Sequence, residues 1–452
     1  MIWKSNKMKS HLRILALFLT VLAAKAQNNL PVFYDQHWTL HSSKYIPSKL
    51  GDDYGIFNAT IANPYTYLNN SGFDLDNLGK INNSKVDRAI GQMAPSNIMG
   101  IGMDIDIIGM SYKIKKKDKE FMSFSFFATE RIGTNFIYSK DFFDLIWNGN
   151  AKFEGKTADL TLGYNAHWLR EYAIGWSMPI DIPSVGDDVK IKAGARLKYL
   201  QGFGAISFPK SNISLATSAG GRSLLFETDY TMNFAGFNGN TFQLDPFNSR
   251  GSGFGVDLSG TVSFLKNFEA SLAVIDIGSV KFKSETYQYS RRTQIDFQGI
   301  PIRDIIKSND FNVTDYVETQ FKGDQASAVS FTNPLPTRLI LQGEYKTQKS
   351  TKKKNREYYD KRACLTYIQG FNNIPGATTK PFVSVGYNHS FNYVFTAGST
   401  MQYGGYGRFG LGLNGSLRLG GLRVGIGTTN ILGTTGLYGS GVDFTFLTGI
   451  TI

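Results

Sequence analysis

The chain has 452 residues, a formal net charge of +12 and one cysteine. Its length allows two or three ordinary domains or one large β domain, and a hydrophobic content of 42% excludes a disordered chain. Glycine is abundant at 48 residues and aromatic residues make up 14%, a mixture typical of many strands joined by tight turns. Because Cys364 is alone, no intrachain disulfide holds the fold.

The first 26 residues have the features of a secretory signal peptide. Basic residues precede the apolar run 14–24, and Ala24-Lys25-Ala26 forms a small-residue cleavage motif. We therefore expect export, with residues 1–26 removed. Removal lowers the net charge from +12 to +7, because this segment holds five basic and no acidic residues. Export also excludes nucleic acid as the expected partner.

Segments of about ten residues alternate between apolar and polar side chains along the rest of the chain. In 254–264, for example, Phe254, Val256 and Leu258 alternate with Gly255 and Asp257. Alternation of this kind indicates half-buried strands, and their length is near the roughly 9–11 residues that a tilted strand needs to cross a bilayer. No uncharged apolar run after the leader approaches ~18 residues, so we expect no membrane-spanning helix.

Fourteen such segments can be placed, and bacterial single-chain barrels have an even number of strands. They lie near 99–115, 120–138, 157–167, 168–182, 189–200, 253–264, 268–283, 337–346, 356–370, 381–389, 391–403, 406–418, 420–430 and 441–452. The sequence therefore predicts an all-β fold, a transmembrane antiparallel β-barrel of about 14 strands, within a range of about 12–16.

The connections between these segments fit an outer-membrane barrel. If the last strand ends in the periplasm, then the connections 201–252, 284–336, 371–380 and 432–440 lie outside and several very short joins lie inside. The long connection 139–156 falls on the inner side as an exception.

Residues 27–98 are less regular than the rest of the mature chain. We expect them to form either a plug in the barrel lumen or extra strands. Residues 99–452 then form the barrel, with the long outer loops 201–252 and 284–336.

The segment 189–199, VKIKAGARLKY, has one apolar face and one face with four cations. Turning these cations toward lipid would cost up to ~2–4 kcal/mol each near the bilayer midplane, so we expect the apolar face to meet the bilayer. The same alternation assigns further charged side chains to the lumen. The expected basic residues are Lys190, Lys192, Arg196, Lys198, Arg338, Arg418 and Arg423, and the expected acidic residues are Asp104, Asp106, Asp159, Asp257 and Glu344.

The mixed signs of these side chains favour ion pairs that fill the lumen. The alternative is a path that favours anions, or a pocket for a ligand with an acidic head group.

The sequence favours neither an enzyme nor a cofactor protein. It contains no GxSxG, HExxH or CxxC motif, and the GxGxxG match at 410–415 lies inside an alternating strand, where no dinucleotide site forms. His37 and His41 have the spacing of a ligand pair, but no third ligand is spaced to join them. We therefore expect no catalytic residues, no cofactor and no metal site.

Several short motifs match a known family. They are Asn70-Ser71-Gly72-Phe73, 121–126 (FMSFSF), Glu130-Arg131, 147–150 (WNGN), 170–175 (REYAIG), 194–202 (GARLKYLQG), 255–258 (GVDL), Asp276-Ile277-Gly278, and 410–412 (GLG) through Thr429-Asn430. With these motifs the chain resembles a family of Bacteroidota outer-membrane β-barrels of unknown function, similar in architecture to fatty-acid-transporter-type barrels. The resemblance implies a barrel in the outer membrane of a Gram-negative, Bacteroidota-like bacterium, and it brings no catalytic or binding residues.

Two functions follow as expectations. The first is uptake or binding of a small hydrophobic, amphipathic or anionic ligand, and the second is a non-transporting accessory barrel of a secretion or surface-assembly complex. The expected partners are outer-membrane lipid and lipopolysaccharide, together with other outer-membrane or periplasmic proteins. A transporter should show a continuous path past 27–98, whereas a scaffold should be plugged and should carry an apolar patch on 201–252 or 284–336.

Overall fold

The computed structural model describes residues 40–52, 55–74, 82–117, 119–181, 189–238, 241–242, 245–265, 267–297, 327–350, 357–434 and 439–452. The expected signal peptide and His37 lie outside these ranges.

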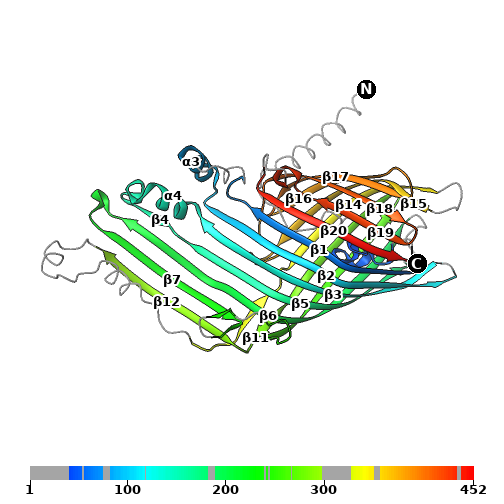
Figure 1. Cartoon of the computed structure of the whole chain (residues 1–452), viewed down its shortest axis with the longest axis horizontal. Coiled ribbons are helices and arrows are strands. Elements are labelled where there is room, and N and C mark those ends of the chain that lie inside the picture. Colours follow the sequence, from blue (N-terminus) through cyan, green and yellow to red (C-terminus); the bar gives the residue numbers. More distant parts are fainter. Residues whose placement is uncertain are drawn as a thin grey trace, which may run out of the picture.

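Fourteen antiparallel strands close into one barrel (Figure 1). In ring order they are β1 (Phe57–Asn70), β2 (Ser96–Lys116), β3 (Lys119–Ser139), β5 (Leu162–Ile180), β6 (Lys190–Thr217), β10 (Gly251–Phe264), β11 (Phe268–Phe282), β14 (Arg338–Ser350), β15 (Glu357–Gly370), β16 (Phe382–Ser390), β17 (Phe395–Gly404), β18 (Phe409–Leu419), β19 (Leu422–Thr428) and β20 (Gly441–Thr451). Strand β1 pairs with both β2 and β20, and these pairings close the ring. The predicted fold class is confirmed.

The remaining elements are short or lie outside the ring. The strands are β4 (Lys156–Asp159), β7 (Leu224–Ala235), β8 (Phe237–Asn238), β9 (Thr241–Phe242), β12 (Thr286–Phe297) and β13 (Phe331–Pro334). The helices are α2 (Ser42–Tyr45), η1 (Pro47–Lys49), α3 (Asn83–Gln92), α4 (Lys140–Asn148), η3 (Asn150–Phe153), η4 (Ala219–Gly221) and α7 (Ile431–Thr434). Within the described residues, no helix has the length and apolarity needed to cross a membrane.

The strands form because their side chains suit a wall with a polar inside and an apolar outside. In β6, Leu197 and Tyr199 are 53% and 41% exposed, whereas Arg196 and Lys198 are 2% and 4% exposed. In the neighbouring β10, Phe254 is likewise exposed and Asp257 is buried. Successive side chains of a strand point to opposite faces, so the alternation read from the sequence places charges inside and hydrocarbon outside.

The two ends of the barrel differ in the length of their connections. The end that holds the C-terminus, called here the turn end, carries short turns such as Gly420–Gly421 between β18 and β19. The opposite end, called here the loop end, carries the connections 71–95, 140–161, 218–250, 283–337, 371–381, 405–408 and 429–440. The connection 139–156 was expected at the turn end, and that prediction is wrong.

This error comes from one miscounted hairpin. Residues 157–182 were predicted as two strands, but 162–180 form the single strand β5, because the alternation continues in one phase and no turn-forming residue interrupts it at 167–168. The count of fourteen is kept because β1, from the irregular region 27–98, takes the missing place in the wall.

One side of the wall continues beyond the ring at the loop end. Strand β6 pairs with β10 only as far as Gly202. On that edge its residues 205–217 then pair with β7, and β7 pairs with β12. On the other edge β6 pairs with β5 as far as Ile206 and with β4 at residues 214–217. We call β4, residues 203–217, β7 and β12 the sheet extension, which is seen at the left of Figure 1. The predicted outer loops 201–252 and 284–336 therefore contain ordered strands.

The sheet extension has a small core of its own. Ala158 and Leu160 pack with Phe153, and Ile213 and Phe226 lie against them. Helix α4 contributes Phe142 and Leu145 to the same cluster. The apolar face of β4 is thus covered by α4 and η3 instead of facing lipid.

Candidate functional site: the luminal plug and its ion network

Residues 40–52 form a plug inside the barrel. The segment contains α2 and η1, and residues 40–51 are all buried although six of them are Lys, Ser or His. Lys44 Nζ lies 2.5 Å from Asp106 Oδ1 on β2, and Lys49 Nζ lies 3.0 Å from Glu344 Oε2 on β14. The plug thus makes ion pairs with strands on different sides of the ring.

The backbone of the plug is held by wall side chains as well. Ser48 N–H donates to Ser259 Oγ at 2.6 Å, and Ser177 Oγ donates to the Leu50 carbonyl at 2.7 Å. Arg196 Nη1 donates to the Lys44 carbonyl at 2.6 Å. A buried irregular segment needs partners for its polar backbone groups, and these contacts supply three of them.

Apolar contacts complete the fit of the plug. Tyr45 and Ile46 pack into a buried cluster with Ile275, Ile340 and Phe382 of the wall. On the other flank, Leu40 and Leu50 pack with Phe127 and Ala173. Burial raises the pKa of the Tyr45 hydroxyl well above its usual 10.0, so Tyr45 stays neutral.

The close approach of the plug explains why the cationic face of VKIKAGARLKY has a glycine at position 194. A Cβ at this position would lie 2.3 Å from Ser48 N and 2.4 Å from the carbonyl carbon of Pro47. Both atoms belong to the plug backbone, which therefore approaches the wall closely only because residue 194 has no side chain.

We expect Gly194→Val to loosen the plug. Lys44 and Lys49 are 7% and 2% exposed, so trypsin should not cleave after them in the unchanged protein. In the variant, the clash with the plug backbone should expose both sites, and mass spectrometry of the tryptic peptides should detect cleavage after Lys44 and Lys49. Gly260→Val on β10 is the matched control, because a Cβ there meets open space. Equal protection in both variants would contradict the close packing at Gly194.

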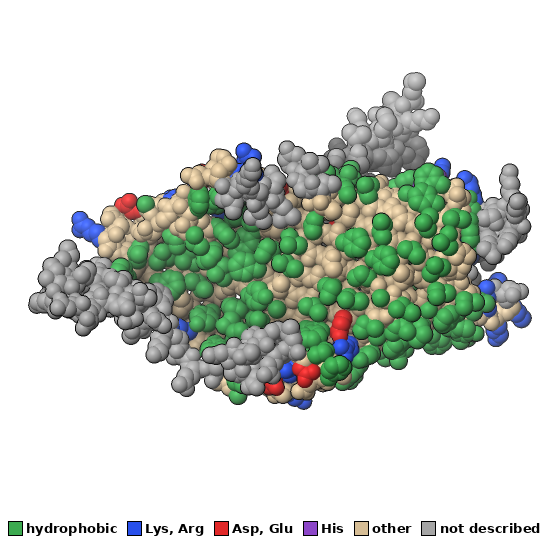
Figure 2. All heavy atoms as spheres, in the orientation of Figure 1, with side chains coloured by type: hydrophobic (Ala, Val, Ile, Leu, Met, Phe, Trp, Pro, Cys, Tyr) green, Lys and Arg blue, Asp and Glu red, His purple; other side chains and the backbone are tan. Residues whose placement is uncertain are grey.

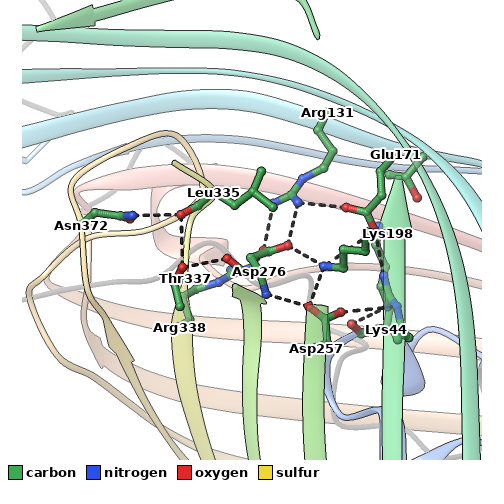
Figure 3. A network of polar contacts seen from close by, with 12 residues as sticks. Lys44, Arg131, Glu171, Lys198, Asp257, Asp276, Leu335, Thr337, Arg338 and Asn372 are labelled. Atoms are coloured by element: carbon green, nitrogen blue, oxygen red, sulfur yellow. Dashed lines mark hydrogen bonds and ion pairs between the residues drawn. The ribbon is translucent and has the colours of Figure 1, made fainter. Parts of the chain in front are cut away.

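An ion network lies between the plug and the loop end (Figure 3). Its centre is Asp276 on β11, whose carboxylate lies 3.0 Å from Arg131 Nη1, 2.5 Å from Lys198 Nζ and 3.1 Å from Arg338 Nη2. All of these side chains are buried. One carboxylate thus joins cations from three other strands.

Glu171 and Asp257 extend this network toward the plug. Glu171 lies 3.1 Å from Arg131 and 2.8 Å from Arg196. Asp257 lies 2.8 Å from Lys198 and 3.4 Å from Arg196. Because Arg196 also binds the Lys44 carbonyl, the network and the plug form one continuous set of contacts.

Three of the four cations in VKIKAGARLKY meet carboxylates of the same chain. Lys192 lies 2.8 Å from Asp52 of the plug and 2.9 Å from Glu120 of β3. Arg196 and Lys198 belong to the ion network, and Lys190 is exposed at the turn end. The contacts of Lys192, Arg196 and Lys198 fit the expectation of ion pairs that fill the lumen.

The other residues expected in the lumen have mixed positions. Arg338 is in the ion network, Arg423 is buried, and Arg418 lies over the Tyr393 ring at 4.0 Å. Asp106 and Glu344 bind the plug, and Asp257 is in the network. Asp104 is half-buried. It lies close enough to Arg131 to interact with it electrostatically.

The prediction that Asp159 faces the lumen is wrong. Asp159 lies on β4 in the sheet extension, outside the ring, and its side chain is exposed and accepts a hydrogen bond from Thr161 N–H. The alternation around it was read correctly as a strand. However, the apolar face of that strand packs under α4, so its polar face points to solvent and not to a lumen.

The sequence reasoning missed Arg131, Glu171 and Asp276 as luminal residues. Adjacent opposite charges within strands are a signal for the first two, since neighbours in a strand must face opposite sides. Arg131 and Glu171 pair inside, whereas Glu130 and Arg170, each one position away, form an ion pair on the outer face.

Asp276 was hidden by a β-bulge. The register between β10 and β11 shifts between Val256 and Leu258, and Asp276 has a φ of 59°. Ile275 and Asp276 are both buried, whereas Ile277 is 41% exposed, so the alternation changes phase at this point. A bulge places an extra residue in one strand and re-aims its side chain, here into the network.

Described parts of the loop-end connections are buried above the network. Tyr406 is fully buried and donates to the carbonyl of Ile374 or Ala377, at 2.9 and 2.6 Å, while Asn135 Nδ2 donates to the Tyr406 oxygen. Leu335 is fully buried as well, and its carbonyl accepts from Asn372. Segments of three loop-end connections, 283–337, 371–381 and 405–408, therefore fold into the barrel mouth.

The described residues include no group of three or more His, Cys, Asp or Glu side chains placed to hold a metal ion. His41 Nδ1 instead lies 3.2 Å from Asp106 Oδ2 and its ring packs edge-on against Tyr45. It belongs to the plug contacts.

The comparison with protein families decides where this barrel belongs. The model of a family described as "Family of unknown function (DUF5723)" matches residues 55–428, from just before β1 to the end of β19. The chain belongs to DUF5723. The predicted membership in a barrel family of unknown function is confirmed, and the plug residues 40–52 of this DUF5723 member precede the matched range. No curated protein matches the chain.

Several solved structures are similar in fold. A ΔS2S3 mutant of the TodX monoaromatic hydrocarbon channel has 9% identity and a TM-score of 0.44, covering 92% of this chain and 95% of that one. The Ralstonia pickettii toluene transporter TbuX has 9% identity and a TM-score of 0.43, covering 95% of each chain. A Pseudomonas aeruginosa FadL homologue has 8% identity and a TM-score of 0.42, covering 95% of this DUF5723 chain and 99% of its own. These likenesses concern the fold alone.

Proposed function

We propose that this protein is an outer-membrane β-barrel with a closed lumen that acts as an accessory component of a larger surface assembly. The observation that carries the proposal is the plug, which is buried, ion-paired to opposite walls and continuous with the ion network. Among the two functions expected from the sequence, a plugged lumen favours the accessory barrel over uptake through the lumen.

The outer surface supports a membrane location. Large hydrophobic side chains are exposed around the ring, among them Phe254 at 72%, Ile426 at 55% and Val385 at 55%. Figure 2 shows hydrophobic side chains over the visible wall, with most charged groups near its rims. An apolar band of this kind is unfavourable in water and matches the lipid-facing band of outer-membrane barrels, whose interiors are polar.

The length of β6 supports a part outside the membrane. This strand has 28 residues, whereas a tilted strand crosses the hydrocarbon with roughly 9–11. Residues 203–217 account for roughly 50 Å of strand at about 3.3 Å per residue. The sheet extension therefore projects beyond the bilayer at the loop end, which faces the cell exterior if the short turns face the periplasm.

The sheet extension offers a surface for a partner protein. On one face of the sheet extension, Phe234 packs edge-on against Tyr289, which is 37% exposed. Phe247, in the connection between β9 and β10, is 93% exposed. The opposite face carries Asp229 and the 89% exposed side chain of Arg292. Aromatic residues exposed outside a membrane are enriched at protein interfaces, so the aromatic face is the proposed docking surface.

We expect the double variant Tyr289→Glu/Phe247→Glu to lose a bound partner. The full chain, purified in mild detergent from its native cells, should migrate as a complex on native gels, and the two added carboxylates should release it by desolvation cost and repulsion. Arg292→Glu, on the polar face of the same strand, is the matched control and should keep the complex. Recovery of the unchanged protein as a monomer alone would contradict the accessory role.

A further inference from the structure

The barrel wall has a break at the loop end between β18 and β20. Strand β19 ends at Thr428, and its last pairs are Thr428 with Leu413 on β18 and Gly427 with Thr445 on β20. Beyond this point, residues 441–444 of β20 pair only with β1 among the described strands. The short helix α7 packs against β18 and β20 at the break.

Side chains replace the missing ladder of backbone hydrogen bonds. Asp443, which is 3% exposed, accepts from Thr429 N–H at 2.8 Å and from Thr429 Oγ1 at 2.5 Å. Gln402 Nε2 donates to the Thr429 carbonyl at 2.9 Å. Polar backbone groups exposed to hydrocarbon cost several kcal/mol each, so these contacts make a break in the wall tolerable within a membrane.

A cavity of about 660 Å³ lies over this break on the outer face of the wall. Its walls include Ile101, Leu413, Ile426 and Phe444, which are 41%, 46%, 55% and 49% exposed and point away from the lumen. Ligand pockets have volumes of roughly 300–1,000 Å³ and are mostly apolar, so the cavity has the size and lining of a binding site.

We propose that this cavity binds an acyl chain of a membrane lipid. The cavity opens on the apolar outer face, so a bilayer brings acyl chains to it in excess over any other apolar molecule. Among the described residues that line the cavity, Asp443 carries a carboxyl group, and none is Lys, Arg or His. An anionic head group is therefore disfavoured inside, and the hydrocarbon end of the chain enters while the head group stays at the membrane interface.

The proposal rests on the membrane location proposed above and does not depend on the partner role. The test uses the full chain in phosphatidylcholine vesicles that contain a small fraction of palmitic acid bearing a photoactivatable diazirine. After irradiation, peptide mass spectrometry should find residues 413–434 and 442–444 labelled about tenfold more per exposed apolar residue than the rest of the outer face, a preference of about 1.4 kcal/mol. Excess unlabelled palmitic acid should remove this preference.

Two glycines supply matched variants. A side chain at Gly415 would project from β18 into the cavity, and a Cβ there meets nothing within 4 Å, so Gly415→Phe should fill the site without a backbone clash. Gly343 on β14 also has open space around it and lies away from the cavity, so Gly343→Phe should keep the wild-type labelling.

The outcomes separate the site from the membrane location. Loss of the preferred labelling in Gly415→Phe, with retention in Gly343→Phe, is the expected result. Uniform labelling of the outer face in the unchanged protein overturns the cavity proposal and leaves the membrane location standing, whereas no labelling anywhere overturns both. If Gly415→Phe does not fold, competition by unlabelled palmitic acid in the unchanged protein decides.

Discussion

Replacing both Lys44 and Lys49 by alanine is expected to open the lumen to small solutes. Lys44 pairs with Asp106, and Lys49 pairs with Glu344 and lies 3.4 Å from Glu269. Removing one partner of a buried ion pair typically lowers the free energy of unfolding by about 3–5 kcal/mol, because the remaining charge stays buried without a partner or water to stabilise it. Both losses disappear if the plug leaves the barrel and water enters to solvate the carboxylates.

Liposome swelling measures this opening. Vesicles that contain the double variant should swell in small sugars, whereas vesicles with the unchanged protein should not. Lys116→Ala/Lys117→Ala is the matched control, because it removes the same charge from exposed residues at the turn between β2 and β3. Absence of swelling in the plug variant, with the barrel still folded, would mean that contacts other than the two ion pairs hold the plug.

Replacing Asp276 by asparagine is expected to destabilise the barrel more than any other single change in the network. The carboxylate faces Arg131, Lys198 and Arg338, all 7% exposed or less, and the change leaves these cations with a net uncompensated charge. We expect a loss of about 3–5 kcal/mol in the free energy of unfolding. Urea unfolding of the protein in lipid vesicles, followed by the gel mobility of the folded form, provides the measurement.

A second substitution identifies the cause of this loss. Adding Lys198→Met to Asp276→Asn removes one of the uncompensated cations, so the double variant should be more stable than the sum of the two single losses indicates. Asp159→Asn is the control on the exposed sheet extension and should change stability by less than about 0.5 kcal/mol. Additive losses at positions 276 and 198 would show that the two side chains do not share a charge network.

The wall of the barrel could be predicted from the sequence because its signal is local. Each strand such as β6 or β10 repeats an apolar and a polar side chain, and that repeat alone fixes which face meets water. Strand β1 was left ambiguous because its pattern is broken. Ala62 has a φ of 53°, the register with β20 shifts between Ala59 and Tyr65, and Pro64 lies within the strand.

The plug was predicted only as one of two alternatives for residues 27–98, and its bounds and contacts could not be predicted, because nothing in 40–52 repeats. Its position is set by partners far away in the chain, such as Glu344, which is 295 residues from Lys49. Asp276 was missed for a related reason, since a bulge changes the phase of the alternation without a mark in the composition of the strand. Local patterns thus gave the faces of the wall, and long-range contacts decided what fills the lumen.

Electrical recording of the full, unchanged chain in planar lipid bilayers tests the closed lumen most directly. A barrel whose plug pairs with both sides of the wall and joins the ion network should insert and show no stepwise ion conductance across the voltage range. Insertion can be confirmed in the same bilayers with the Lys44→Ala/Lys49→Ala variant, which should produce open steps. Stable, long-lived conductance steps from the unchanged protein would contradict the closed lumen and restore uptake through the barrel as its function.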